Sequence, residues 1–215
     1  MDAPNADEVV TEAIAAAVAQ RWDLVALFGG LETGAEVEAD ALNATFPTPP
    51  NPRGVLATLL AVAASSVLGG VTNGTTQTAT SFWREVQQAL FFPQGFNEMP
   101  TAILWPSKLA QLYIDAYDTT NQPLRMPENI ASMSKFTTNQ IPSGMTPGTG
   151  TNMADLFTGD WRQLLMGQRL DLTVQVLSER YAENGQIGIV AHWRGDVALA
   201  RPRAFSVFRY LKASA

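Results

Sequence analysis

The chain has no cysteine and one histidine, His192, among its 215 residues. Without cysteine, disulfide bridges, thiolate zinc sites and cysteine nucleophiles are excluded. With one histidine, metal sites built on several histidines are excluded, and a serine hydrolase would have one candidate for its general base. No apolar run has the length of a membrane span, and the opening MDAPNADE lacks the basic and apolar regions of a signal peptide. We therefore expect neither a metal nor a cofactor nor insertion into a membrane.

Basic residues are also scarce, with 14 lysines and arginines against 20 aspartates and glutamates, so the formal net charge is −6. A dedicated nucleic-acid-binding protein usually has a basic face, and this balance argues against sequence-specific recognition of DNA or RNA. The hydrophobic share of 46% is sufficient for a buried core, which excludes a disordered chain.

The charges are unevenly distributed along the chain. Residues 1–40 hold nine acidic side chains and one arginine, whereas residues 161–215 hold eight basic and four acidic ones. Ordinary solvated faces would explain this, but complementary surfaces that meet between copies of the chain would explain it too. On the second interpretation, the predicted inter-subunit contact residues are Asp7, Glu8, Glu12, Glu36, Glu38, Arg162, Arg169, Arg194, Arg201 and Arg203.

The first predicted element is a helix that follows the capping residue Asn5 and ends at Phe28, before Gly29 and Gly30. Its apolar residues fall on one stripe, and about 23 residues at about 1.5 Å each make a rod of roughly 35 Å. The proline-rich stretch 31–52 predicts an extended loop.

The remaining elements alternate irregularly between helix and strand, so the pattern predicts an α+β fold with mixed, mainly antiparallel sheets. In chain order they are an apolar segment at 54–67, a helix at 82–91, a buried strand at 101–105, a helix opened by Pro106, a strand within 130–142, a helical turn at 161–166, and strands at 172–177, 186–192, 197–200 and 205–210.

Three groups of residues could indicate chemistry, and each has a simpler explanation. The glycine-rich stretch 146–151 lacks the Gly-Lys-Ser/Thr ending of a phosphate-binding loop. His192 lies in a predicted strand, and no Gly-x-Ser-x-Gly nucleophile turn accompanies it. The aspartate pairs Asp155 with Asp160 and Asp115 with Asp118 are better placed to cap helices and turns than to act together. We therefore predict no catalytic, metal-binding or cofactor-binding residue.

The second half of the chain resembles the major capsid proteins of tailed phages, which share the HK97 fold. The resemblance rests on Leu104-Trp105-Pro106, on Gly159-Asp160-Trp161 followed by Leu164 to Arg169, on Tyr181 to Asn184, and on Arg201 to Phe205. It covers residues 100–212, and the opening helix is similar to the long spine helix of that family.

The resemblance implies a structural subunit, not an enzyme, that assembles into pentamers and hexamers of an icosahedral shell around double-stranded DNA. It places residues 1–53 and 156–215 in a peripheral domain and residues 54–155 in an axial domain. It implies location in the virion, and in the bacterial host cytoplasm during assembly, with scaffolding or portal proteins as further partners. Family members have an arm and an extended loop before the spine helix, so we expect a C-terminal fragment or a degenerate prophage copy that forms monomers or small rings.

Two alternatives remain at this point. The first is the shell protein of an encapsulin-type bacterial nanocompartment, which shares the fold. The second is a small α+β enzyme that uses Asp155 or His192.

Overall fold

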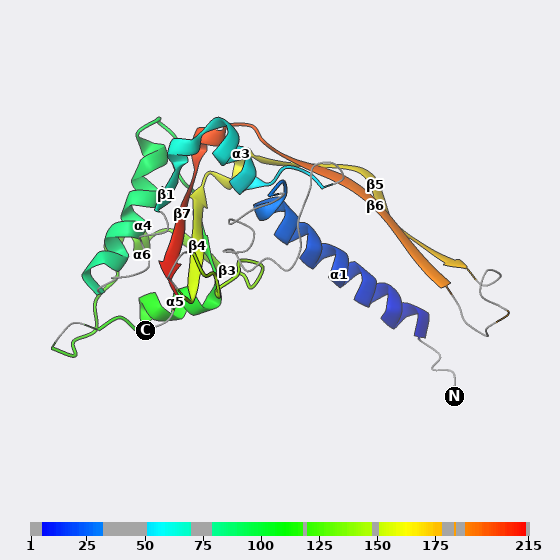
Figure 1. Cartoon of the computed structure of the whole chain (residues 1–215), viewed down its shortest axis with the longest axis horizontal. Helices are drawn as coiled ribbons and strands as arrows, with labels where there is room; N and C mark the ends of the chain where they lie inside the picture. Colours follow the sequence, from blue (N-terminus) through cyan, green and yellow to red (C-terminus); the bar gives the residue numbers. More distant parts are fainter. Residues whose placement is uncertain are drawn as a thin grey trace.

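The computed structural model describes residues 6–31, 51–69, 79–117, 120–147, 151–177, 183 and 188–213. It has the predicted α+β class, and two parts are distinct in Figure 1: a body built on a five-stranded sheet, and a layer that projects from it. In the described part of the chain, no helix is both long enough and apolar enough to span a bilayer.

The five-stranded sheet has the order β1-β7-β4-β2-β3. Its strands are β1 (Val67–Gly69), β7 (Phe205–Lys212), β4 (Met153–Gly159), β2 (Ala102–Trp105) and β3 (Ser134–Thr137). The outer strands β1 and β3 run parallel to their neighbours, whereas β4 is antiparallel to both β2 and β7. With the antiparallel pair β5 and β6, three of the five pairings among the described strands are antiparallel, in agreement with the prediction.

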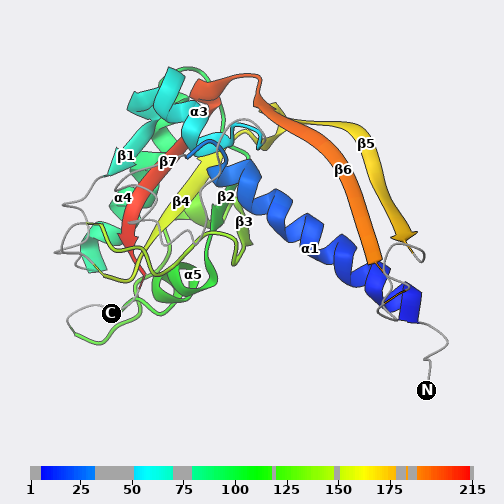
Figure 2. The same ribbon diagram turned by 45° about the vertical axis from the view of Figure 1, so that its right-hand side comes forward.

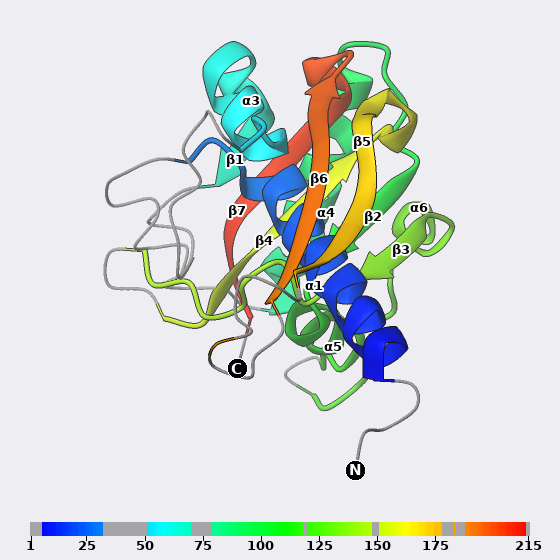
Figure 3. The ribbon, with the colours of Figure 1, turned by 90° about the vertical axis from the view of Figure 1, so that its right-hand side faces the viewer.

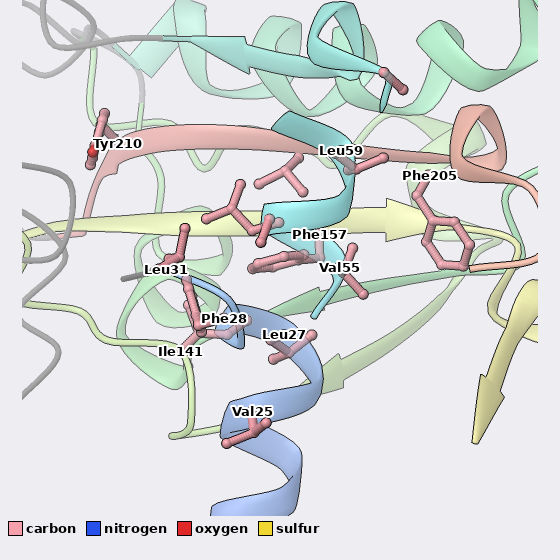
Figure 4. Packing of buried hydrophobic residues seen from close by; sticks show 14 of the residues in the cluster. Val25, Leu27, Phe28, Leu31, Val55, Leu59, Ile141, Phe157, Phe205 and Tyr210 are labelled. Carbon is pink, nitrogen blue, oxygen red and sulfur yellow. The ribbon is translucent and has the colours of Figure 1, made fainter. Parts of the chain in front are cut away.

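Hydrophobic clusters cover both faces of this sheet. One face packs against α3 (Val55–Val62) and the end of α1 (Ala6–Phe28), as Figure 4 shows. The other face packs against α4 (Ala79–Gln94), α5 (Ser107–Ile114) and α6 (Glu128–Ala131). The body is therefore a helix–sheet–helix sandwich.

Strand β4 is buried along its whole length and connects the two clusters. Phe157 points into the cluster with α1 and α3, and Leu156 points into the opposite cluster. The pairing register with β7 shifts between Ala154 and Leu156, but the alternation of side chains continues, so Ala154 and Leu156 both face the second cluster while Met153 and Phe157 face the first.

The projecting layer consists of α1 and the long strands β5 (Leu164–Leu177) and β6 (Gly188–Leu199). The two strands form a separate two-stranded sheet that arches over α1 in Figures 1 and 2. Only the last turn of α1 is buried, because residues 25–28 enter the body while the rest of the helix extends away from it. Figure 3, turned by a right angle from Figure 1, shows α1 and the two strands running together.

A proline inside α4 leaves one backbone carbonyl of the helix without its usual hydrogen bond, and side chains of the neighbouring sheet supply the donors. Pro93 lies in the last turn of α4 and has no N–H to donate to the carbonyl of Ala89 one turn earlier. The buried hydroxyls of Ser206 and Thr158 donate to that oxygen at 2.6 and 3.1 Å and lie 2.9 Å from each other. Polar residues on β4 and β7 therefore replace the backbone hydrogen bond that the proline removes from the helix.

Most predicted elements are confirmed, and several boundaries differ. The opening helix ends at Phe28 as predicted, but α4 begins at Ala79 and continues to Gln94. The predicted helical turn at 161–166 is wrong after Gln163, because a short 3₁₀ turn, η2 (Trp161–Gln163), leads directly into β5. The predicted strand at 197–200 is the end of β6. Within the predicted strand range 130–142, residues 130–131 belong to the end of α6 and residues 134–137 form β3. Strand β4 was not predicted, and most of the proline-rich stretch 31–52 lies outside the described residues.

Candidate interaction surfaces

The projecting layer meets the body at a close crossing of two glycines. The amide of Gly54 donates to the carbonyl of Gly29 at 2.8 Å. A Cβ atom added at Gly54 would lie 2.7 Å from the nitrogen of Gly29, and Gly30 has a φ of +85°. Glycine is thus required here for both close approach and a left-handed turn. The predicted helix stop therefore also anchors α1 to the start of α3.

Farther along the layer, α1 and β6 enclose a groove of about 680 Å³. Trp22 of α1 contacts Trp193 of β6 edge to face, with ring centroids 4.2 Å apart. The indole N–H of Trp22 also points at the sulfur of Met166 at 3.4 Å. Ile14 and Val18 line the same groove from the helix. The apolar stripe predicted for the opening helix therefore faces the two strands.

Large apolar side chains remain exposed over the rest of the layer. On the strands these include Leu165, Leu170 and Val176, and on α1 they include Val9 and Val10. A two-stranded sheet with so much exposed apolar surface has little intrinsic stability. The layer is therefore a candidate surface for contact with another protein chain.

The five predicted contact arginines have different surroundings. Arg162 forms an ion pair with Asp160 at 2.8 Å, and Arg201 forms one with Glu98 at 2.9 Å. The guanidinium carbon of Arg203 lies 4.9 Å from the centre of the Phe96 ring. The other two, Arg169 and Arg194, are exposed on the strands and form no ion pair with any residue that the structure describes.

The acidic contact residues are separated from these arginines within one chain. Glu8 and Glu12 are exposed near the free end of α1. The side chain of Asp7 and the positions Glu36 and Glu38 lie outside what the structure describes. The structure therefore brings none of the described acidic contact residues into an ion pair with the predicted basic ones.

A second groove, which we call the corner groove, lies at the edge of the body where three elements meet. Its volume is about 500 Å³, and it lies between the end of α3, the turn after α4 and the 3₁₀ turn η4 (Pro202–Ala204). It is lined by Val62, Ala63, Phe96, Glu98, Ala200, Arg201, Pro202 and Arg203. The sequence did not predict it, because its walls come from segments far apart in the chain. Pro202, after the predicted contact residue Arg201, is the single local signal of a turn there.

The candidate catalytic carboxylates do not form a pair. Asp155 is fully buried, where its Oδ2 lies 3.2 Å from Nε of Arg209 and its Oδ1 accepts the N–H of Tyr210 at 3.0 Å. Burial raises the pKa of Asp155, and the charge of Arg209 partly opposes that rise. Asp160 lies five residues farther along an extended strand, about 16 Å away at about 3.3 Å per residue. Asp155 therefore serves the packing of β4 against β7.

The other candidates also have structural roles or lie on the surface. Asp160 caps η2, since it accepts the N–H of Arg162, and hydrogen bonding from Arg162 holds the pKa of that carboxyl below its usual value. His192 is exposed on β6, and Asp115 follows the end of α5. Asp118 lies outside the described residues. Within the described ranges, no three histidines, aspartates or glutamates gather as metal ligands would.

Comparison with known proteins gives one family and a consistent set of structures. The model of the phage capsid family matches residues 33–210. A similar solved chain comes from Mycobacterium phage Ogopogo, with 16% sequence identity and a TM-score of 0.63 over 95% of this chain and 68% of that one. Another comes from the capsid of an empty GTA particle, with 12% identity and a TM-score of 0.66 over 100% of this chain and 68% of that one. A chain of the holo-SrpI encapsulin complex of Synechococcus elongatus is also similar, with 12% identity and a TM-score of 0.53 over 95% of this chain and 65% of that one.

No curated protein matches the chain. The chain spans about two thirds of the length of the solved chains it resembles. At these identities the structural likeness establishes a shared fold.

Proposed function

Because the chain belongs to the phage capsid family and is a structural capsid subunit, we propose that copies of it associate into the pentamers and hexamers of an icosahedral shell. The observation that carries this proposal is the projecting layer. Its strands and most of α1 lie outside the body and retain exposed apolar side chains. In a shell of identical subunits, such surfaces are covered by neighbouring copies.

We further propose that the two parts of the molecule correspond to the two domains that the resemblance implies. The projecting layer is the peripheral domain, and the five-stranded body is the axial domain. Strand β7 pairs with β4 and β1, so residues 205–212 lie in the body and not with β5 and β6. A boundary that assigns all of 156–215 to the peripheral domain would divide this sheet.

The charge of the chain supports a role as a container for double-stranded DNA. A net charge of −6 gives the protein little attraction for a phosphate backbone, which suits a lining that must not hold packaged DNA. We place the protein in the virion, and in the bacterial host cytoplasm during assembly, with itself as principal partner and scaffolding or portal proteins as further ones. The proposal includes no catalytic step.

The test is the association state of the purified protein. Sedimentation velocity over a range of concentrations should show monomers that associate reversibly into small rings, and negative-stain electron microscopy should show those rings rather than closed shells. We expect the association to weaken from low to high salt, because exposed charge pairs are screened over about 8 Å at physiological ionic strength. A protein that remains monomeric at every concentration would contradict the proposal.

The likeness to an encapsulin complex keeps a bacterial nanocompartment shell as the second candidate. Genes for a terminase and a portal protein beside this one would support a phage shell, and their replacement by a gene for a cargo enzyme would support the nanocompartment. The enzyme alternative gains no support from the structure, because Asp155 is buried against Arg209 and His192 lies on an exposed strand.

A further inference from the structure

The free end of α1 has a surface of mixed character. Val9 is 63% exposed, and the exposed carboxylates of Glu8 and Glu12 lie on the neighbouring side of the helix. Residues 8 and 12 are one helical turn apart and therefore lie on the same side of the helix. This end of the molecule thus combines apolar side chains with negative charge.

The corner groove has the complementary character. Val62 is 67% exposed and Phe96 is 38% exposed, so the groove offers apolar contact. Arg201 and Arg203 stand at its edge with the single carboxylate of Glu98, which leaves one net positive charge. Arg203 covers the Phe96 ring and forms no ion pair with any described residue.

These two surfaces cannot meet within one molecule. In Figures 1, 2 and 3 the free end of α1 lies at the opposite side of the molecule from α3. The helix is anchored to the body at its other end by the Gly29–Gly54 crossing, so it extends away from the corner groove. Only a second copy can bring the two surfaces together.

We infer that the corner groove of one copy receives the free end of α1 of a neighbouring copy. This inference rests on the proposed function and names the partner surfaces within it. Val9 enters beside Val62 and Phe96, while Glu8 and Glu12 face Arg201 and Arg203. The mode is that of an amphipathic helix in an apolar groove, with charge fixing its orientation.

The contact joins two different patches, so each copy offers a helix end to one neighbour and a groove to another. Contacts of this kind propagate head to tail and close into rings where the rotation between copies allows it. The inference therefore gives a physical origin for ring formation that does not require the body surfaces to match one another.

Cysteine crosslinking tests the contact directly, since the chain has no native cysteine. We would mix Val9→Cys protein with Val62→Cys protein under mild oxidation, at a concentration where sedimentation shows association. The expected product is a disulfide-linked dimer, and a chain carrying both substitutions should give a ladder. The matched control mixes Val9→Cys with Val176→Cys, another exposed valine, and should give little dimer. Equal yields from the two mixtures would overturn the inference.

Charge reversal provides a second readout that does not depend on disulfide geometry. Arg203→Glu should weaken association roughly tenfold, and adding Glu12→Arg to the same chain should restore most of the loss. Arg169→Glu makes the same charge change on the strands and should have a smaller effect. If rings form but neither crosslink nor charge rescue occurs, the docking inference is wrong and the capsid proposal stands. If no association occurs at all, the capsid proposal itself fails.

Discussion

The body and the projecting layer differ in where their stabilising contacts come from. In the body, β4 is buried at every position and hydrophobic clusters cover both faces of the sheet. In the layer, β5 is exposed or half-buried along its whole length, and α1 is buried only in its last turn. Both regions contain large apolar residues, but the body buries most of its own, whereas many of those in the layer remain exposed.

This difference indicates that the body provides stability and that the layer provides surface for association. The body has extensive internal contacts on both faces of its sheet, whereas the layer is joined to it at the Gly29–Gly54 crossing and leaves many of its apolar side chains exposed. Substitutions should therefore act on stability in one region and on association in the other.

The largest effect is expected in the core of the body. Phe157→Ala removes a ring that packs edge to face on Phe28 at 5.5 Å and should lower the free energy of unfolding by about 3–5 kcal/mol. Val176→Ala, on the exposed part of β5, should change it by less than about 0.5 kcal/mol. Urea unfolding of both variants measures the difference. If the two variants lost similar amounts of unfolding free energy, the layer would contribute as much to stability as the body, and the contrast between the two regions would be wrong.

A smaller effect is expected from the polar contact at Ala89. Replacing Ser206 by Ala and Thr158 by Val leaves the Ala89 carbonyl without its two hydroxyl donors and should cost about 1–3 kcal/mol. Adding Pro93→Ala returns a backbone N–H one turn away and should recover part of that loss. Thermal unfolding of the parent and of these two variants provides the measurement. A Pro93→Ala substitution that deepens the loss would contradict this explanation of the network.

Within the layer, Trp193→Ala should act locally. Losing the contact with Trp22 should reduce the free energy that holds the strands against α1 by about 1 kcal/mol. Hydrogen exchange should then accelerate at the amides of β6, while protection of β4 remains unchanged. His192→Ala, on the opposite face of the same strand, is the control. Loss of protection across β4 would show that the layer and the body unfold together.

The smallest effect lies at the junction, where Asp160 caps the turn that begins the layer. Its pKa is lower in the folded protein than the ordinary 3.8, so its ionised form stabilises the fold above that pH. This contribution is lost as the pH falls through the folded pKa. Asp160→Asn should be less stable than the parent by under about 1 kcal/mol near neutral pH, because Arg162 is largely exposed. The difference should close below pH 3.8, and a constant difference would exclude ionisation as its cause.

The sequence predicts elements whose signals are local and misses those that depend on distant partners. The bounds of α1 follow from its apolar stripe and from Gly29, and the cap at Asp160 follows from the residues beside it. Strand β4 escapes prediction because Asp155 and Thr158 interrupt its apolar pattern, and both residues acquire partners only through β7 and α4. The start of β5 resembles a helical turn because its apolar residues are consecutive.

The candidate surfaces could be predicted from the sequence only where their residues are neighbours in the chain. Uneven charge along the chain pointed to arginines near the end of the sequence, but it could not show that Arg162 is paired with Asp160 within the chain. Nor could it place Phe96 and Val62 beside Arg203, because these residues come from three separate elements. The resemblance supplied the family, and the three-dimensional arrangement supplied the surfaces.

The glycine crossing at the root of α1 has a mechanical consequence. The helix is a lever about 35 Å long that is fixed at one end, so a turn of only about 10° at the root moves its tip by about 6 Å. A Cβ atom at Gly54 would force the end of α1 away from the start of α3, because its nearest obstacles are backbone atoms of residues 25–29. If the tip of α1 docks on a neighbouring copy as inferred above, the angle between lever and body sets the direction in which that copy is added. On that inference, a backbone contact that leaves no room for a side chain at Gly54 helps to set how strongly the assembled surface bends.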